Sequence, residues 1–278
     1  MAGSIPQWFF LLSVGLFGLL FGSLANVIIW RVPRGESIVS PGSHCPTCGT
    51  AIRWYDNVPV VSWVVLRARC RTCGARISAR YPIVEALSAI LWLLAAVLWG
   101  ISIRTVFGVC LFYLLLVLTY IDIDHLRLPN AVVATLAGIG VIGVAVAQWG
   151  GMPAVPFFLG GGVTASPLGS AAVGLLIGVG VSVAMAGGYA LVRKSAGLGT
   201  GDIKLLGVLG IYFGPYVLMV LMAGSILGAV TGLLTLRKHA EGAAARIPFG
   251  PFLAVAAVIV AAWGPSIWNW YIGLAGLS

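Results

Sequence analysis

Long, predominantly apolar segments separated by short polar breaks dominate the hydrophobic pattern of this chain. Seven such segments occupy about residues 7–30, 82–100, 103–121, 131–149, 168–192, 216–236 and 248–273. A helix needs about 20 apolar residues to cross a bilayer, so each segment is predicted to span a membrane. Residues 203–214 form a shorter apolar piece, roughly half a bilayer long, which ends at Gly214-Pro215. The pattern predicts an all-α polytopic membrane protein with about eight transmembrane helices.

The composition excludes an ordinary soluble protein. Hydrophobic residues make up 60% of the chain and charged residues only 8%, whereas a soluble domain is about one quarter charged. We predict that residues 1–30 contain the first transmembrane helix, read as an anchor and not as a cleaved signal peptide, because no basic region precedes it. Residues 31–81 are the one sizeable polar insert, and residues 82–278 form the remaining membrane-embedded part.

The distribution of basic residues predicts the orientation of the chain in the membrane. Eight arginines lie in the insert at 31–81, so the positive-inside rule places the insert in the cytoplasm and the N-terminus outside. If successive segments cross the membrane in alternating directions from there, only Arg104 of the sixteen basic residues lies outside. The inside set beyond the insert comprises Arg127, Arg193, Lys194, Lys204, Arg237, Lys238 and Arg246. Arg237 and Lys238 lie inside only if residues 203–236 cross the membrane twice, which favours eight crossings. Seven crossings or a re-entrant hairpin remain as alternatives.

Two of the seven acidic residues stand at the cytoplasmic ends of apolar segments. Asp122 follows the segment at 103–121, and Asp202 precedes the short piece at 203–214. The predicted topology therefore places both carboxylates at the same membrane face. Asp124, two residues beyond Asp122, would point to the opposite side of a helix and is expected to face the headgroups or His125.

A pair of carboxylates in a poorly solvated place tends to share one proton. Such a pair can take a proton from water and give one to a leaving amine, which is the chemistry of aspartic peptidases. The glycines before Asp202, among them Gly199 and Gly201, would let a substrate backbone approach, and Lys204 is expected to tune the pair or hold a phosphate headgroup. Two alternatives remain: each aspartate caps a helix, or the pair forms an ion site in a transporter.

The insert contains two C-x-x-C-G sequences 21 residues apart. The spacing is typical of a zinc ribbon, in which two knuckles direct four thiolates at one structural Zn²⁺. The predicted ligands are Cys45, Cys48, Cys70 and Cys73. Two disulfides or unbound thiols are the alternatives, and a cytoplasmic location disfavours the disulfides. Short strands are expected at about 51–54 and 60–66.

Glu85 lies where the second apolar segment begins. A carboxylate at a helix start interacts favourably with the helix dipole. Burial within a membrane helix would instead indicate substrate or cofactor binding, because an intramembrane carboxylate is costly. The second interpretation is slightly favoured.

Taken together, these motifs resemble the bacterial type IV prepilin peptidases, of the GxGD aspartic membrane protease class. The resemblance covers nearly the whole chain. It is carried by F-G-S-L-A-N-V-I-I-W-R-V-P, the two C-x-x-C pairs with I-R-W-Y-D-N-V-P-V-V-S-W between them, R-Y-P-I-V-E, I-D-I-D-H-L-R-L-P-N, G-T-G-D-I-K-L-L-G and I-P-F-G-P-F-L-A.

The resemblance implies an enzyme of the bacterial inner membrane that cuts the basic leader from prepilins or pseudopilins, after a glycine and at the cytoplasmic face. It assigns Asp122 and Asp202 as the catalytic pair and residues 31–81 as a zinc-binding region. Members with such a region usually also methylate the new N-terminus with S-adenosylmethionine. The expected partners are the prepilin substrate and the lipid bilayer, without nucleic acid. An ion-coupled transporter using the same carboxylates is the alternative function.

Overall fold

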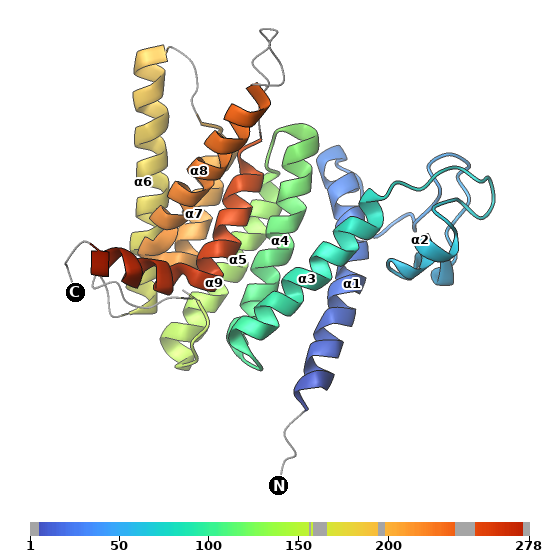
Figure 1. Cartoon of the computed structure of the whole chain (residues 1–278), viewed down its shortest axis with the longest axis horizontal. Coiled ribbons are helices and arrows are strands. Elements are labelled where there is room, and N and C mark those ends of the chain that lie inside the picture. Colours follow the sequence, from blue (N-terminus) through green and yellow to red (C-terminus); the bar gives the residue numbers. More distant parts are fainter. Residues whose placement is uncertain (1–5, 156, 158–165, 194–197, 237–247, 275–278) are drawn as a thin grey trace. The chain divides into compact units, whose positions relative to one another are not determined.

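The computed structural model describes residues 6–155, 157, 166–193, 198–236 and 248–274 and contains no strand among them. Figure 1 shows its helices in chain order. They are α1 (Gln7–Arg31), α2 (Val61–Val65), α3 (Arg80–Trp99), α4 (Ile103–His125), α5 (Asn130–Gly150), α6 (Pro167–Arg193), α7 (Thr200–Phe213), α8 (Val217–Leu236) and α9 (Gly250–Leu274), with 3₁₀ turns η1 (Val32–Arg34), η2 (Trp54–Asn57) and η3 (Gly214–Tyr216).

All eight predicted apolar segments are helices, which confirms an all-α membrane protein. By length and hydropathy, the described residues contain seven candidate membrane spans. The count is seven because one candidate, Thr200–Leu234, contains both α7 and most of α8. At 14 residues, α7 is about 21 Å long and too short to cross a bilayer alone. It ends at Phe213 and is followed by Gly214, whose φ of +57° suits a residue without a Cβ.

The chain forms two compact units, Met1–Val117 and Leu118–Ser278. The predicted boundaries after residues 30 and 81 rest on composition and stay a prediction. Sidedness also stays a prediction. Several residues that it relies on lie outside the described residues, namely Lys194, Arg237, Lys238 and Arg246.

In the first unit, α1 and α3 form an antiparallel pair with little space between their backbones. A Cβ on Gly18 would lie 2.6 Å from the Ala89 Cα, and one on Gly22 would lie 2.5 Å from the Glu85 Cα. Small residues permit such close approach in membrane helices. The Asn26 side chain donates a hydrogen bond of 3.2 Å to the Tyr81 carbonyl oxygen, which links α1 to α3. Both ends of the insert therefore leave the same end of the pair.

This packing predicts that Gly22→Ala destabilises the first unit. The added Cβ would meet backbone atoms of α3, which cannot move aside cheaply, and overpacking of this kind costs about 1–3 kcal/mol. Gly15→Ala on the same helix is the matched control, because its Cβ would meet only the Leu93 side chain at 3.5 Å. Thermal unfolding of the purified protein in detergent should show a lower Tm for Gly22→Ala alone. Equal Tm values for the two variants would contradict the described packing.

The insert folds without the predicted strands. Residues 54–57 form the 3₁₀ turn η2, and residues 61–65 form the short helix α2. The β-branched run at 60–66 suggested a strand, but a tertiary contact decides the local structure. Val60 has a φ of +60° and donates its N–H to the Glu85 Oε2 at 2.7 Å. This bond fixes the chain just before α2 and turns it away from an extended path.

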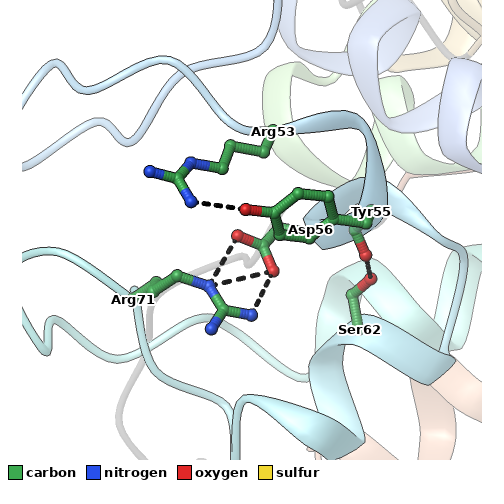
Figure 2. A network of polar contacts seen from close by, with 5 residues as sticks. All are labelled: Arg53, Tyr55, Asp56, Ser62 and Arg71. Atoms are coloured by element: carbon green, nitrogen blue, oxygen red, sulfur yellow. Dashed lines mark hydrogen bonds and ion pairs between the residues drawn. The ribbon is translucent and has the colours of Figure 1, made fainter.

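A polar network fastens η2 to its neighbours in the insert (Figure 2). The Arg71 guanidinium donates hydrogen bonds of 2.6–3.2 Å to both carboxylate oxygens of Asp56. Arg53 donates to the Tyr55 hydroxyl, and the Ser62 hydroxyl donates to the Tyr55 carbonyl oxygen at 3.0 Å. The bonds from Arg71 hold the pKa of the Asp56 carboxyl below its usual value. Arg71, which directly follows Cys70, is thus engaged by a carboxylate.

In the second unit, α7 is the most enclosed helix, and residues 205–213 are all buried. Glycines bring α6 against it, because a Cβ on Gly178 would overlap the Leu206 carbonyl group. On another side, the Tyr212 hydroxyl donates to the Leu136 carbonyl oxygen of α5 at 2.9 Å. These contacts fix the position of α7 and hence of its first turn, which carries Asp202.

Candidate functional site

One cavity of about 200 Å³ in the second unit brings five of the predicted site residues together. It lies where α4 ends and where α5 and α7 begin. Its lining residues are Asp122, Leu126, Arg127, Leu128, Asn130, Gly199, Thr200, Gly201, Asp202 and Lys204. Asp124 is exposed and does not line the cavity.

Asp122 lies within α4, which continues to His125 and so runs beyond the predicted end at residue 121. The residue is 5% exposed. Its Oδ2 accepts a hydrogen bond of 2.9 Å from the backbone N–H of Gly250, the first residue of α9. The first N–H groups of a helix have no partner within the helix, and a carboxylate satisfies them well. The start of α9 therefore orients the Asp122 side chain.

Asp202 is the third residue of α7 and lies in its first turn, which follows the N-cap residue Gly199. Its N–H donates to the Gly199 carbonyl oxygen at 3.1 Å. A Cβ on Gly199 would lie 2.9 Å from the Asp202 Oδ2, so the carboxylate turns back over its own helix start. The Asp202 and Asp122 carboxylates are close enough to interact electrostatically. Gly197, the first of the three closely spaced glycines that precede Asp202, lies outside the described residues.

Leu128 is a shared contact of two glycines at the edge of the cavity. A Cβ on Gly201 would lie 3.2 Å from the Leu128 Cβ, and one on Gly250 would lie 3.4 Å from a Leu128 methyl group. The starts of α7 and α9 thus both approach the loop between α4 and α5. Gly250 was not among the predicted site residues. The available sequence signal was its position in the motif I-P-F-G-P-F-L-A. That motif supported the family resemblance but was not assigned to the site.

Lys204 lines the cavity but forms no ion pair with either aspartate in the part of the chain that the structure describes. Its Nζ donates instead to the Asn130 Oδ1 at 3.0 Å, which links α7 to the start of α5. The structure therefore places this lysine at the rim as a link between helices. Whether its charge acts on the two aspartates stays a prediction.

The contact between α9 and α4 predicts an effect of Gly250→Ala. The added Cβ would lie 2.8 Å from the Asp122 Oδ2, so the carboxylate or the start of α9 must shift. If Asp122 takes part in the reaction, a misplacement of its carboxylate by about 1 Å is expected to lower the rate on the order of 10²-fold. Gly138→Ala in α5 is the matched control, because no atom lies within 4 Å of its Cβ. Rates of peptide cleavage at equal protein level measure the effect, and equal rates for the two variants would argue against the proposed positioning.

Glu85 does not line this cavity. It is 8% exposed in α3, and its Oε2 accepts a hydrogen bond from the Val60 N–H. Glu85 is buried, as expected for a carboxylate that binds a substrate or cofactor. The contact that its carboxylate makes here, however, is with the backbone of the insert. The structure thus gives Glu85 a role in joining the insert to α3.

The four predicted cysteine ligands lie together in the insert. Their Sγ atoms are all within 4.8 Å of one another, and the Cys45 and Cys73 sulfurs are 3.9 Å apart. Each pair is built in the same way. Gly49 donates its N–H to the Cys45 carbonyl oxygen and Gly74 donates to that of Cys70, both at 2.9 Å. Both glycines have a φ near +70°, which closes the two knuckles.

This geometry suits a tetrahedral metal. Zinc–sulfur bonds of about 2.3 Å place the four sulfurs about 3.8 Å apart, close to the Cys45–Cys73 separation. The backbone N–H of Cys48 lowers the pKa of the Cys45 thiol, and that of Cys73 lowers the pKa of the Cys70 thiol. All four cysteines are free, so the predicted alternative of disulfides is not found. Four convergent thiolates would hold one metal ion.

Comparisons with known proteins cover nearly the whole chain. Residues 16–99 match the bacterial Peptidase A24 N-terminal domain, and residues 109–233 match the type IV leader peptidase family. A prepilin leader peptidase/N-methyltransferase of Aeromonas salmonicida (strain A449) is 35% identical over 300 residues, which cover 98% of this chain and 97% of the relative. The protein of the same name from Legionella pneumophila is 33% identical over 290 residues, covering 96% of each. No solved structure matches this chain significantly.

Proposed function

This chain belongs to the bacterial type IV leader peptidase family, and we propose that it removes the leader from prepilins or pseudopilins after a glycine. The observation that carries the proposal is the cavity shared by Asp122 and Asp202. Two carboxylates from separate helices meet there with no basic residue paired to either among the described residues. The relatives are named as peptidases, which favours cleavage over the ion-coupled transport that the same carboxylates also suggested.

In the proposed reaction, the two carboxylates act on one water molecule and one peptide bond. One carboxylate takes a proton as the water attacks the carbonyl carbon, and the protonated partner gives a proton to the leaving amine. The Gly250 N–H holds the Asp122 Oδ2 in place during this exchange. Gly199 and Gly201 keep side chains away from the edge of the cavity, which leaves room for an extended substrate backbone.

The relatives' names also include N-methyltransferase. We propose that this chain methylates the new N-terminus with S-adenosylmethionine as the methyl donor. We further propose that residues 31–81 are a zinc-binding region with Zn²⁺ held by the four cysteines, and that residues 82–278 form the peptidase domain. In the proposed orientation, the chain lies in the inner membrane with the insert and both aspartates on the cytoplasmic side.

One assay tests the two activities together. The full chain, reconstituted in lipid vesicles, is mixed with a purified prepilin in the presence and absence of S-adenosylmethionine. The expected product is a pilin shortened to the residue after a glycine, with one added methyl group only when the methyl donor is present. An unshortened prepilin would overturn the peptidase proposal, and a shortened product that never gains the methyl group would overturn the methyltransferase proposal.

A further inference from the structure

A second cavity, of about 310 Å³, lies in the insert and is lined mainly by arginines. We call it the arginine hollow, and its lining residues are Arg67, Ala68, Arg69, Arg76 and Ile77. It is built on the second cysteine knuckle, because residues 69 and 76 are paired in an antiparallel bridge on either side of that knuckle. The hollow is thus held in shape by the same turn that presents Cys70 and Cys73.

The charges around the hollow are not balanced by the protein. None of its three arginines pairs with a carboxylate in the described part of the chain. The two acids of the insert do not neutralise these arginines, since Asp56 is engaged by Arg71 and Glu36 forms no ion pair with them among the described residues. Like charges directly opposite in a bridge disfavour one another, as Arg69 and Arg76 do here. An external anion would relieve this repulsion.

The backbone beside the hollow is strained in the same place. Arg67 has a φ of +50° and Ala68 one of +58°, although neither is a glycine. Two consecutive residues in this region are costly and are often kept where they serve a site. Here the turn directs the chain from α2 back toward the second knuckle, which brings the first arginine to the hollow.

An exposed apolar turn leads directly into these arginines. The short helix α2 leaves Val61, Val64 and Val65 between 57% and 68% exposed, and Arg67 follows two residues later. Apolar side chains next to arginines are the combination that binds membrane interfaces, where the apolar groups enter the acyl boundary and the cations contact phosphates. Neither the exposed valines nor the arginines alone would indicate membrane binding, but the two side by side do.

The insert is also tethered at a membrane surface. It leaves and re-enters at the same end of the antiparallel α1–α3 pair, and both helices are candidate spans. Between those helices, residues 32–79 contain six arginines and two carboxylates, a net charge of +4. We propose that the insert docks on the bilayer through α2 and the arginine hollow, and that the hollow binds the phosphate of an anionic phospholipid headgroup.

Amide hydrogen exchange of the full, metal-loaded chain in nanodiscs tests this proposal. We expect peptides covering residues 61–77 to be protected in discs that contain phosphatidylglycerol, and not in discs of phosphatidylcholine alone. The variant Arg69→Gln/Arg76→Gln should lose this protection, since each arginine near an anionic surface contributes about a fivefold gain in binding. The control Arg34→Gln/Arg53→Gln removes the same charge from the insert outside the hollow and should keep it.

Three results would overturn the proposal. The first is equal protection in the two kinds of disc, and the second is equal loss in both double variants, which would indicate a general effect of charge. The third is protection produced by inorganic phosphate in phosphatidylcholine discs, which would indicate a site for a soluble anion. If Arg69→Gln/Arg76→Gln fails to retain metal, Val64→Ser/Val65→Ser decides the question. It changes only exposed side chains and should also lose the protection, and full protection in it would contradict docking through α2.

Discussion

Asp202→Asn is expected to slow prepilin cleavage by about 10²–10⁴-fold without changing the amount of protein in the membrane. Asparagine keeps the shape of the side chain but can neither take up nor release the proton that the reaction requires. Asp122→Asn is expected to have an effect of the same order, because both carboxylates line the same cavity. Cleavage rates in vesicles, normalised to the amount of each variant, measure the loss.

Asp124→Asn is the matched control for these variants. Asp124 lies two residues from Asp122 on the same helix, yet it is exposed and outside the cavity. Its replacement removes the same charge from the same end of α4 and should leave the cleavage rate near that of the unchanged protein. A loss in Asp124→Asn as large as in Asp122→Asn would mean that the charge at this helix end matters more than the position of one carboxylate.

Cys70→Ser is expected to abolish metal binding by the insert. Structural zinc contributes on the order of 10 kcal/mol to the folding of small metal-dependent domains, and three remaining thiolates cannot complete the tetrahedral site. Beyond the polar network and the bond to Glu85, little of the insert is buried, so a bound metal would supply much of its stability. Metal analysis of the purified chain should fall from about one zinc per chain to near zero.

Cys110→Ser separates this effect from the general loss of a thiol. Cys110 lies within α4, away from the four sulfurs of the cluster. Its replacement should leave the zinc content unchanged. Retention of zinc by Cys70→Ser, with the insert as resistant to proteolysis as before, would refute a four-cysteine site.

Much of the fold follows from hydropathy because lipid imposes a simple rule on the chain. Backbone groups in the bilayer core must be satisfied within the segment, so an apolar run of sufficient length becomes a helix. The predicted start of α4 agrees with the structure at residue 103, and that of α6 agrees within one residue. The end of α4 was placed too early, since Asp122 and Asp124 were read as a boundary although the helix continues to His125.

The insert and the edge of the candidate site were harder to predict, because contacts between distant residues decide their structure. The run at 60–66 has the composition of a strand, but the bond from Val60 to Glu85 precedes a helical turn. Asp122 and Asp202 were paired through the topology, whereas the part played by Gly250 depends on a hydrogen bond across 128 positions. No local pattern near either residue encodes that bond.

The central claim is that Asp122 and Asp202 act as one catalytic unit. Its most direct test compares the prepilin cleavage rates of Asp122→Asn, Asp202→Asn and the double variant in the same vesicles, with long incubations and mass detection of the product. Residues that act as a unit show strongly non-additive losses. We predict that the double variant retains the same residual rate as either single variant. Losses that multiply in the double variant, or near-normal cleavage by either single variant, would contradict the account.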